Sequence, residues 1–226
     1  MIKNESRHFN ISVEGINCER LYFIHLAKLI NESGSNKYNL SVKPIVASPM
    51  EYAKRMAARA SDTNKGKKLP YIHVQDIEDY NSEFFRNKFY GIIDEMRKAE
   101  DSFNLTYQLG YSNYTFELWM LLHVADMKHA IQDRHAYLAP INRWFDKKYK
   151  DLDEFKAEFE FQSILDTYVT LDSIKLAMKR AERIVQMNKE EHKKKENYHG
   201  FSFYHENPDL TIHEVVQMIF DVCGVK

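Results

Sequence analysis

The chain has 226 residues, of which 44% are hydrophobic and 29% charged, and its formal net charge is −1. This length and apolar fraction suit one large domain, or a core domain with an extension, and they exclude wholesale disorder. A net charge near zero provides no overall attraction to nucleic acid or membranes, so any contact with a polyanion must come from local basic patches.

Cysteine and glycine usage excludes several common motifs. Cys18 and Cys223 form no CxxC, which excludes a zinc ribbon or thioredoxin motif and favours a reducing cytoplasm. We find no apolar run typical of a signal peptide and no stretch of about 18 apolar residues, so we expect a cytoplasmic protein without contact to a membrane. The seven glycines stand singly, so neither GxGxxG nor GxxxxGK[ST] occurs. Phosphate would have to be bound by side chains or by a metal.

The first half of the chain predicts alternating strands and helices. Alternating apolar residues predict strands over 9–14, 38–47, 69–75 and 103–109. Helical periodicity predicts helices over 18–31, 49–60 and 82–101, and the apolar segment YTFELWMLLHVA predicts a buried helix over 114–125. This order of elements indicates an α/β fold with a mainly parallel sheet flanked by helices.

The strand pattern fades after about residue 126. Helical segments are predicted around PINRWF and DEFKAEF, over 171–191, and over 209–222. We therefore expect a core over 1–125 and a helical extension over 126–226 that packs on it as part of one structural unit. The charged run Asn188–Asn197 is interpreted as a solvated helix end.

Acidic residues follow successive predicted strands. Glu14 follows the first strand, Asp76, Glu78 and Asp79 follow the third, and Glu117 lies in the first turn of the helix after the fourth. Parallel sheets bind ligands at the carboxyl ends of their strands, so these side chains are expected to converge there. Such oxygens hold Mg²⁺ or Mn²⁺, and a spare carboxylate can accept a proton from water. Taken singly, each acid is more simply explained as a turn residue or helix cap.

Four sequence blocks resemble the motifs of RloB proteins, a family of bacterial defence components related to AbiLii-like proteins. In order, they are VEGINCERLYF (13–23), VQDIEDY (74–80), YSNYTFELWMLLHV (111–124) and NPDLTIHEVVQMIF (207–220). The third block, with FELW followed by LLH, is the most specific. The resemblance implies a Toprim-like core and metal-dependent cleavage of nucleic acid in anti-phage defence by abortive infection. It also implies a partner ATPase of the ABC or SMC-like type.

The same resemblance assigns roles to individual residues. It implies that Glu14 is a metal ligand or general base, and that Asp76 and Glu78 form a catalytic acidic pair. It places Asn113 and His123 at the border of the site. The full set of metal ligands that it implies for Mg²⁺ or Mn²⁺ is Glu14, Glu19, Asp76, Glu78, Asp79 and Glu117.

Three departures from the family pattern keep a second hypothesis open. Cys18 stands where threonine is common, Glu78 where aspartate is usual, and Tyr114 where a proline follows Asn113. A catalytically degenerate core would then act as a binding or sensor subunit of an ATPase-containing defence complex. Primer synthesis or strand transfer is a weaker alternative because no companion domain is recognisable. A phosphatase with a nucleophile in Asp76–Asp79 would leave the FELW block unexplained.

Basic and histidine residues outside these blocks give weaker signals. Lys175, Lys179 and Arg183 are spaced to form one helical stripe that could follow a phosphate backbone, although a solvated face is the more common explanation of such a stripe. Lys67 and Lys68 precede the strand that leads to Asp76 and could steer substrate. The spacing by six of His123, His129 and His135 does not place them on one helical face, so no zinc site is expected. DNA, tRNA and other RNA stay open as substrates, as does a homo-oligomer.

Overall fold

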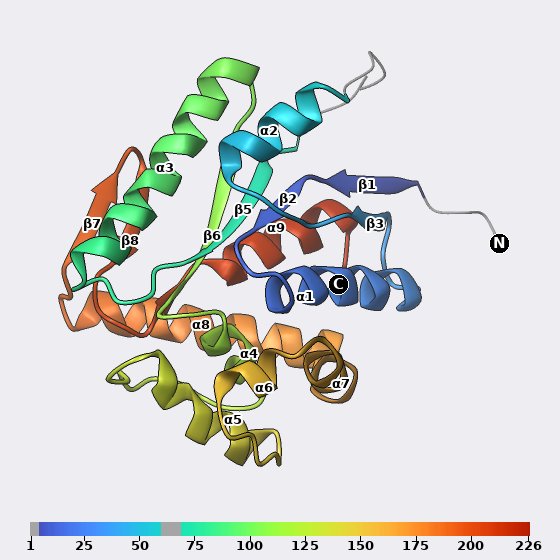
Figure 1. The fold of residues 1–226 in the computed structure, drawn as a ribbon. Helices are drawn as coiled ribbons and strands as arrows, with labels where there is room; N and C mark the ends of the chain where they lie inside the picture. Colours follow the sequence, from blue (N-terminus) through green and yellow to red (C-terminus); the bar gives the residue numbers. More distant parts are fainter. Residues whose placement is uncertain (1–4, 60–68) are drawn as a thin grey trace.

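The structure is a computed structural model that describes residues 5–59 and 69–226. Its centre is a five-stranded sheet in the order β4-β2-β5-β6-β9 (Figure 1). Neighbouring strands run parallel, except that β9 runs antiparallel to β6. The bounds are β4 (Ile45–Val46), β2 (Ile11–Val13), β5 (Tyr71–Asp76), β6 (Tyr107–Asn113) and β9 (Asp209–Leu210). The predicted mixed α/β class with a mainly parallel sheet is therefore confirmed.

Two of the predicted strands are each divided. The stretch 9–14 contains the end of β1 (Ser6–Phe9) and β2, and the stretch 38–47 contains β3 (Asn39–Val42) and β4. β1 and β3 form a separate parallel pair, whereas β2 and β4 belong to the main sheet. Pro44 lies between β3 and β4, where it lacks the amide hydrogen that a continuous ladder requires.

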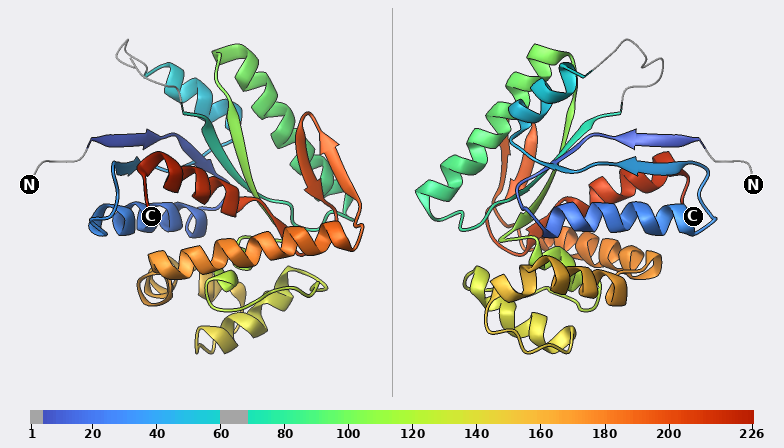
Figure 2. Two further views of the ribbon diagram at one scale, coloured as in Figure 1. Left: turned by 180° about the vertical axis from the view of Figure 1, so that it is seen from behind. Right: turned by 45° about the vertical axis from the view of Figure 1, so that its right-hand side comes forward.

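Helices cover both faces of the sheet, with α1 and α9 on one face and α2 and α3 on the other (Figures 1 and 2). Their bounds are α1 (Cys18–Glu32), α2 (Pro49–Ala57), α3 (Glu83–Phe103) and α9 (Ile212–Cys223). Side chains along β5 alternate between the two sides, so Ile72 and Val74 join the core beneath α1 and α9 while Tyr71 packs toward α2 and α3. On β6, Gly110 permits the close approach of α9, because a Cβ there would lie 3.1 Å from a Val215 methyl carbon.

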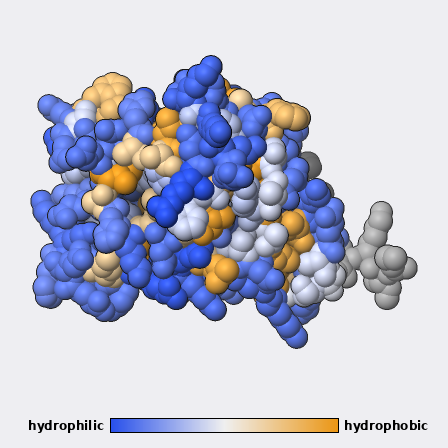
Figure 3. Space-filling model, turned by 90° about the horizontal axis from the view of Figure 1, so that it is seen from below, coloured by the Kyte–Doolittle hydropathy of each residue, from blue (hydrophilic) through white to orange (hydrophobic). Residues whose placement is uncertain are grey.

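A further group of helices lies beneath α1 and α9 (Figure 2). It comprises α4 (Glu117–Leu122), the 3-10 turn η1 (Arg134–Tyr137), α5 (Leu138–Trp144), α6 (Leu152–Lys156), α7 (Glu158–Tyr168) and α8 (Leu171–Glu190). Tyr22 of α1 and Trp119 of α4 meet edge to face with ring centroids 6.0 Å apart, so the group shares the core of the sheet. From below, its surface is mostly hydrophilic with scattered apolar patches (Figure 3). In the described part of the chain, no helix is both long and apolar enough to span a membrane.

The segment 126–226 is not purely helical, which corrects the prediction for the second half. It supplies β9 to the main sheet, and β7 (Lys195–Tyr198) and β8 (Phe201–Tyr204) form an antiparallel hairpin beside α3 (Figure 1). Phe203 of this hairpin packs against Phe89 of α3 with ring centroids 5.1 Å apart. A strand of two residues such as β9 is too short to show an alternating pattern in the sequence. It is recognised as a strand only by its pairing with β6.

The boundaries of two predicted elements are also corrected. The fourth strand was predicted over 103–109, but α3 continues to Phe103 and ends at Asn104, whose φ of 48° lies in the left-handed region. β6 therefore begins at Tyr107 and runs to Asn113, past the predicted end of this strand and up to the helix predicted over 114–125. That helix, α4, is correspondingly short, although its residues are all buried as predicted.

A fragment of residues 1–125 is expected not to fold cooperatively. It lacks β9, which pairs with β6, and α9, whose residues Val215, Val216 and Ile219 are fully buried in the core. Removal of these elements exposes the apolar face of the sheet to water. Urea unfolding followed by circular dichroism, with the full chain as the control, measures this. A reversible, cooperative transition of the fragment would contradict the expectation.

Candidate active site

Four acidic side chains gather at the carboxyl ends of β2, β5 and β6. Glu14 directly follows β2, Asp76 ends β5, Glu117 begins α4 after β6, and Glu19 lies in the first turn of α1. The backbone amide of Glu14 donates to the carbonyl of Val74 at 3.1 Å, which holds the ends of β2 and β5 together. Burial raises the pKa of Asp76, and the charges of the three glutamates raise it further. The positions of acids after the strands predicted that Glu14, Asp76 and Glu117 converge, and Glu19 was expected from the family resemblance alone.

Glu14 is held by donors on two sides. Its Oε2 accepts hydrogen bonds from the backbone amide of Asp76 at 3.2 Å and from the side-chain amide of Gln75. Its Oε1 pairs with the ammonium group of Lys88 on α3. The side chain of Glu14 keeps 27% of its surface exposed. This carboxylate is therefore oriented and still open to solvent.

A buried polar chain leads from Glu14 into the sheet. Because the amide nitrogen of Gln75 donates to Glu14, its oxygen accepts from His73 Nε2, at 3.3 Å. His73 Nδ1 then accepts from the hydroxyl of Ser12, at 2.8 Å. Burial lowers the pKa of His73 to about 4, which agrees with a neutral ring that carries its hydrogen on Nε2. Parallel pairing of Ser12 with His73 places these groups on one face of the sheet, so the strands themselves position Glu14.

Glu19 is buried against the turn that follows β2. A Cβ on Gly15 would lie 1.8 Å from Glu19 Oε2, so only glycine leaves room for this carboxylate. Burial, followed by the charges of Glu117 and Glu14, raises the pKa of Glu19 to about 7. Glu19 therefore takes up a proton far more readily than an exposed glutamate, and a cation bound nearby would compete with that proton.

Asp76 and Glu117 present oxygens that lack partners. Asp76 Oδ1 and Glu117 Oε2 are both buried, and among the described residues neither has a hydrogen-bond partner. Glu117 Oε1 forms an ion pair with Lys156 Nζ at 2.7 Å. Burial lowers the pKa of Lys156, but the neighbouring carboxylate of Glu117 outweighs this and raises the pKa overall. Lys156 is the last residue of α6. Its backbone carbonyl accepts a hydrogen bond from the side-chain amide of Asn17 at 3.0 Å.

Lys88 and Lys156 are site residues that the sequence analysis missed. Lys88 lies in the second turn of α3, and Lys156 belongs to the second half of the chain. No motif spacing connects either lysine to the acids they contact. Only the packing of α3 and α6 brings them to the strand ends.

Glu78 and Asp79, which follow Asp76 in the sequence, lie farther from the centre of the acidic cluster. Glu78 has a φ of 57°, its Oε1 lies 3.8 Å from Arg134, and burial raises its pKa. The charges of Glu14 and Lys88 also act on Glu78, so it lies at the margin of the cluster. Asp79 is exposed and accepts from the amide of Asn81 at 3.0 Å. The structure thus places Asp79 as a turn residue, and it corrects the expectation that this side chain joins the cluster.

Asn113 and His123, the two residues expected at the border of the site, lie in different places: Asn113 at the end of β6 and His123 in the core. Asn113 ends β6 beside Asp209, and its amide donates to the carbonyl of His205 at 2.9 Å. His123 is buried, and its Nδ1 donates to the Trp119 carbonyl at 2.9 Å. Burial lowers its pKa to about 4. The ring of His123 is fixed inside the core, which corrects its expected place at the border.

The predicted basic stripe on α8 is largely engaged within the chain. Lys175 donates to the carbonyl of Lys226 at 2.7 Å, and Arg183 lies 3.7 Å from Asp126. Lys179 is exposed on the same helix. Lys67 and Lys68, predicted to steer substrate, lie outside the described residues.

The donor set of the cluster suits a hard divalent cation. Carboxylate oxygens are the ligands that Mg²⁺ and Mn²⁺ prefer, and the unpartnered oxygens of Asp76 and Glu117 are those that a cation would satisfy. Within the described residues, however, no three histidine, cysteine, aspartate or glutamate side chains are arranged to hold a metal ion. The two lysines supply positive charge instead. The residues fit the cation by their chemistry, and its binding requires some of these side chains to move.

Comparison with known proteins identifies one family. Residues 9–219 match the RloB-like protein family, which covers most of the chain. A search of curated proteins and a search of solved structures found no match. The predicted resemblance is therefore confirmed at the level of the family.

Replacement of Glu19 by glutamine is expected to stabilise the metal-free protein at pH 8 and to have little effect near pH 5. The folded-state pKa of Glu19, about 7, lies above its ordinary value of 4.5. The folded state binds a proton on Glu19 more tightly than the unfolded state does, so the free energy of unfolding is highest at low pH and falls as the pH rises through 7. Glutamine, which is always neutral, avoids this loss. The shift corresponds to at most roughly 3 kcal/mol. Thermal melting in EDTA across this pH range measures the difference.

Glu32→Gln is the matched control, because Glu32 is exposed at the other end of the same helix. Its melting temperature should follow that of the unmodified protein at every pH. If Glu19→Gln also melts in parallel with the unmodified protein from pH 5 to pH 8, ionisation of Glu19 does not destabilise the folded protein and the prediction is wrong.

Replacement of His73 by leucine is expected to destabilise the protein by about 1–3 kcal/mol, because Ser12 and Gln75 lose their buried partner. His8→Leu is the control: His8 Nδ1 and Ser41 Oγ, 3.1 Å apart, join β1 and β3 in the same way at an exposed position. We expect its effect to stay within about 0.5 kcal/mol. Urea unfolding measures both, and equal losses would argue against a special role for the buried chain.

Proposed function

The chain belongs to the RloB-like protein family, and we propose that it is a divalent-metal-dependent endonuclease with a Toprim-like core. The observation that carries this proposal is the carboxylate of Asp76, whose Oδ1 is buried although the residue as a whole is half-buried. One of its oxygens has no hydrogen-bond partner in the described residues, and Glu14, Glu19 and Glu117 surround it at the carboxyl edge of a parallel sheet. Ligands of α/β proteins bind at this edge.

The proposed cofactor is Mg²⁺ or Mn²⁺, which would polarise a phosphoryl oxygen and increase the acidity of water. Asp76 and Glu117 would hold it, because each has a buried oxygen without a hydrogen-bond partner in the described residues, and the buried carboxylate of Glu19 would join them. Without a cation, burial of three carboxylates in one place favours protonation, as the raised pKa values of Asp76 and Glu19 indicate.

Glu14 is the proposed proton acceptor. Its side chain is oriented by Gln75 and by the amide of Asp76, and it keeps contact with solvent, from which the attacking water would come. Lys88 pairs with Glu14 and is 40% exposed, so its ammonium can reach a phosphate at the mouth of the site. Contact with the phosphate would free Glu14 to accept the proton.

The biological setting that we propose follows from the family resemblance. The enzyme would cleave DNA or RNA in anti-phage defence by abortive infection, together with an ATPase of the ABC or SMC-like type. Both features rest on the motif blocks and on membership of the RloB-like family.

One specific observation favours a second candidate function, a catalytically degenerate binding or sensor subunit of the same complex. Lys88 and Lys156 pair with Glu14 and Glu117, and no three of the described metal-binding side chains are arranged as a coordination set. If the lysines replace the metal permanently, the cluster is structural. Titration with Mn²⁺ followed by calorimetry separates the candidates, because a degenerate site would not bind the ion at millimolar concentration.

We expect cleavage of nucleic acid in Mg²⁺ or Mn²⁺ and its loss in EDTA. Glu14→Gln and Asp76→Asn should each reduce the rate at least 100-fold, a loss typical of removing a group that acts on the transition state. The assay is gel electrophoresis of labelled DNA and RNA, with the purified protein alone and with its ATPase partner.

Asp79→Asn is the matched control, because Asp79 lies in the same loop as Asp76 but is exposed and bonded to a turn amide. This variant should retain most of the activity. Undiminished cleavage by the double variant Glu14→Gln/Asp76→Asn, folded as judged by thermal melting, would refute the proposed function.

A further inference from the structure

We propose that two adjoining cavities beside the acidic cluster form a binding groove for an unpaired nucleic-acid strand, so that the substrate is single-stranded at the point of cleavage. The proposal rests on the proposed function and deepens it by naming the substrate class. The larger cavity has a volume of about 450 Å³ and the smaller one about 210 Å³. Tyr114 lines both of them and forms their common wall.

The smaller cavity connects the groove to the acidic cluster. Its lining includes Glu78, Phe85 and Arg134. The charges of Lys88 and Glu14 act on the pKa of Glu78, so Glu78 lies between this cavity and the cluster. Phe84, which contacts Phe85 edge to face and is 71% exposed, lies one helical turn before Lys88 on α3. Residues four apart share a helical face. An exposed aromatic ring therefore stands next to the lysine at the mouth of the site.

The larger cavity contains a fixed aromatic platform. The rings of Tyr80 and His205 are stacked, with centroids 4.1 Å apart and an angle of 23° between their planes. Glu196 fixes both rings, because it accepts from Tyr80 at 3.1 Å and pairs with His205 at 2.5 Å. Both rings line the cavity. Tyr80 is itself buried and supports the half-buried ring of His205, so His205 offers the surface on which a nucleobase can stack irrespective of sequence.

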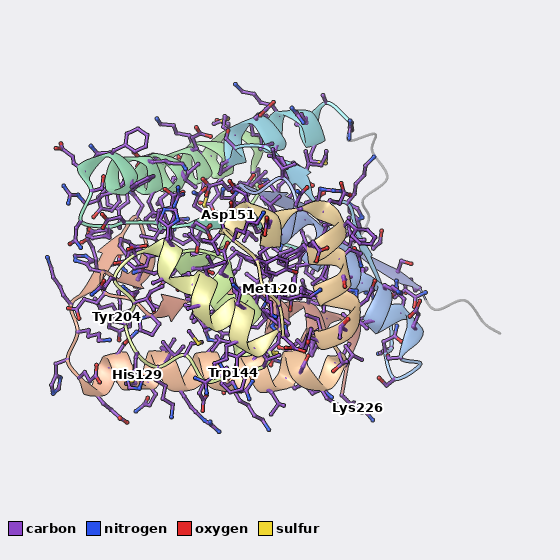
Figure 4. All side chains as sticks on the ribbon, turned by 60° about the horizontal axis from the view of Figure 1, so that its bottom comes forward. Met120, His129, Trp144, Asp151, Tyr204 and Lys226 are labelled. Carbon is purple, nitrogen blue, oxygen red and sulfur yellow. The ribbon has the colours of Figure 1, made fainter. Side chains whose placement is uncertain are left out.

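Positive charge lies beside the platform. Lys128 and His129 are exposed on the loop that lines the larger cavity, and Arg134 lines the smaller one. Figure 4 shows the loop with His129 next to the end of β8 at Tyr204. Asn207 holds the two segments together through the amide and carbonyl of Ile131, at 2.7 and 3.1 Å. Both cavities also contain acidic side chains: Glu191, which forms an ion pair with Lys193 at 3.4 Å, and Glu206 line the larger one, and Glu78, Asp79 and Asp133 line the smaller one.

Unpaired nucleotides suit this groove better than a duplex does. Stacking on protein rings requires bases that are not already stacked in a helix. Duplex binders depend on an extended basic surface, whereas this chain has a net charge of −1 and uses Lys175 and Arg183 of α8 for internal contacts. The rings, with Lys128 and Arg134 as local contacts for phosphate, are therefore the features of the two cavities that favour an unpaired strand.

Fluorescence anisotropy with the Asp76→Asn protein tests the proposal without interference from cleavage. The probes are a labelled single-stranded 12-mer, as DNA and as RNA, and the corresponding duplexes. We expect at least one single strand to bind about tenfold more tightly than its duplex. His205→Ala should weaken that binding about tenfold, the effect of losing one stacked base. Lys128→Ala should make the slope of log affinity against log salt concentration shallower, by about the amount that one phosphate contact contributes.

Lys175→Ala and Lys179→Ala on α8 are the control variants and should leave binding unchanged. Because Lys128 is exposed, its variant should fold even if His205→Ala does not. Equal binding of single strand and duplex, or full affinity of the folded Lys128 and His205 variants, would overturn the proposal. Binding with these properties by a protein that cleaves nothing would refute the proposed nuclease while the groove remains supported.

Discussion

The pairing of β2 with β5 is the constraint on which the candidate site depends. Parallel register places Ser12 beside His73 and Val13 beside Val74, so Glu14 emerges beside Gln75 and its carboxylate reaches the backbone amide of Asp76. A shift by one residue would turn Ser12 and Glu14 to the opposite face and bring Val13 against the buried polar chain. The hydrogen bonds from Ser12 through His73 and Gln75 to Glu14 exist in one register only. The same pairing therefore determines the core of the sheet and the orientation of a catalytic candidate.

Burial of several carboxylates together requires a compensating charge. In this structure Lys88 from α3 and Lys156 from α6 provide it, each by contact with one glutamate. Among the described residues Asp76 receives no such contact, and its raised pKa reflects the cost of burying its charge. The lysines lower that cost without satisfying every oxygen. A divalent cation would compensate the remaining charge, and this balance makes the cluster a stronger candidate for metal binding than an exposed group of acids would be.

The sequence was sufficient for features that depend on local patterns. Strand alternation located β2 and β5, and the position of acids after these strands predicted that Glu14, Asp76 and Glu117 converge. It was insufficient where long-range packing decides. Asp79 follows the same strand as Asp76, but the turn directs it to solvent, and Lys156 reaches the site only because α6 packs beneath α1. β9 is too short to show a pattern, and its pairing with β6 makes it a strand.

The second half of the chain is therefore part of the candidate site and of its surroundings. It supplies Lys156 to the acidic cluster, β9 to the sheet, and His205 to the aromatic platform. Tyr80, which completes that platform, lies in the loop after β5, separated from Asp76 by Ile77, Glu78 and Asp79. The loop thus carries the acidic cluster at one end and the platform at the other. A strand stacked on His205, which Tyr80 supports, would be led along this loop toward Asp76, so the same segment can both position a substrate and act on it.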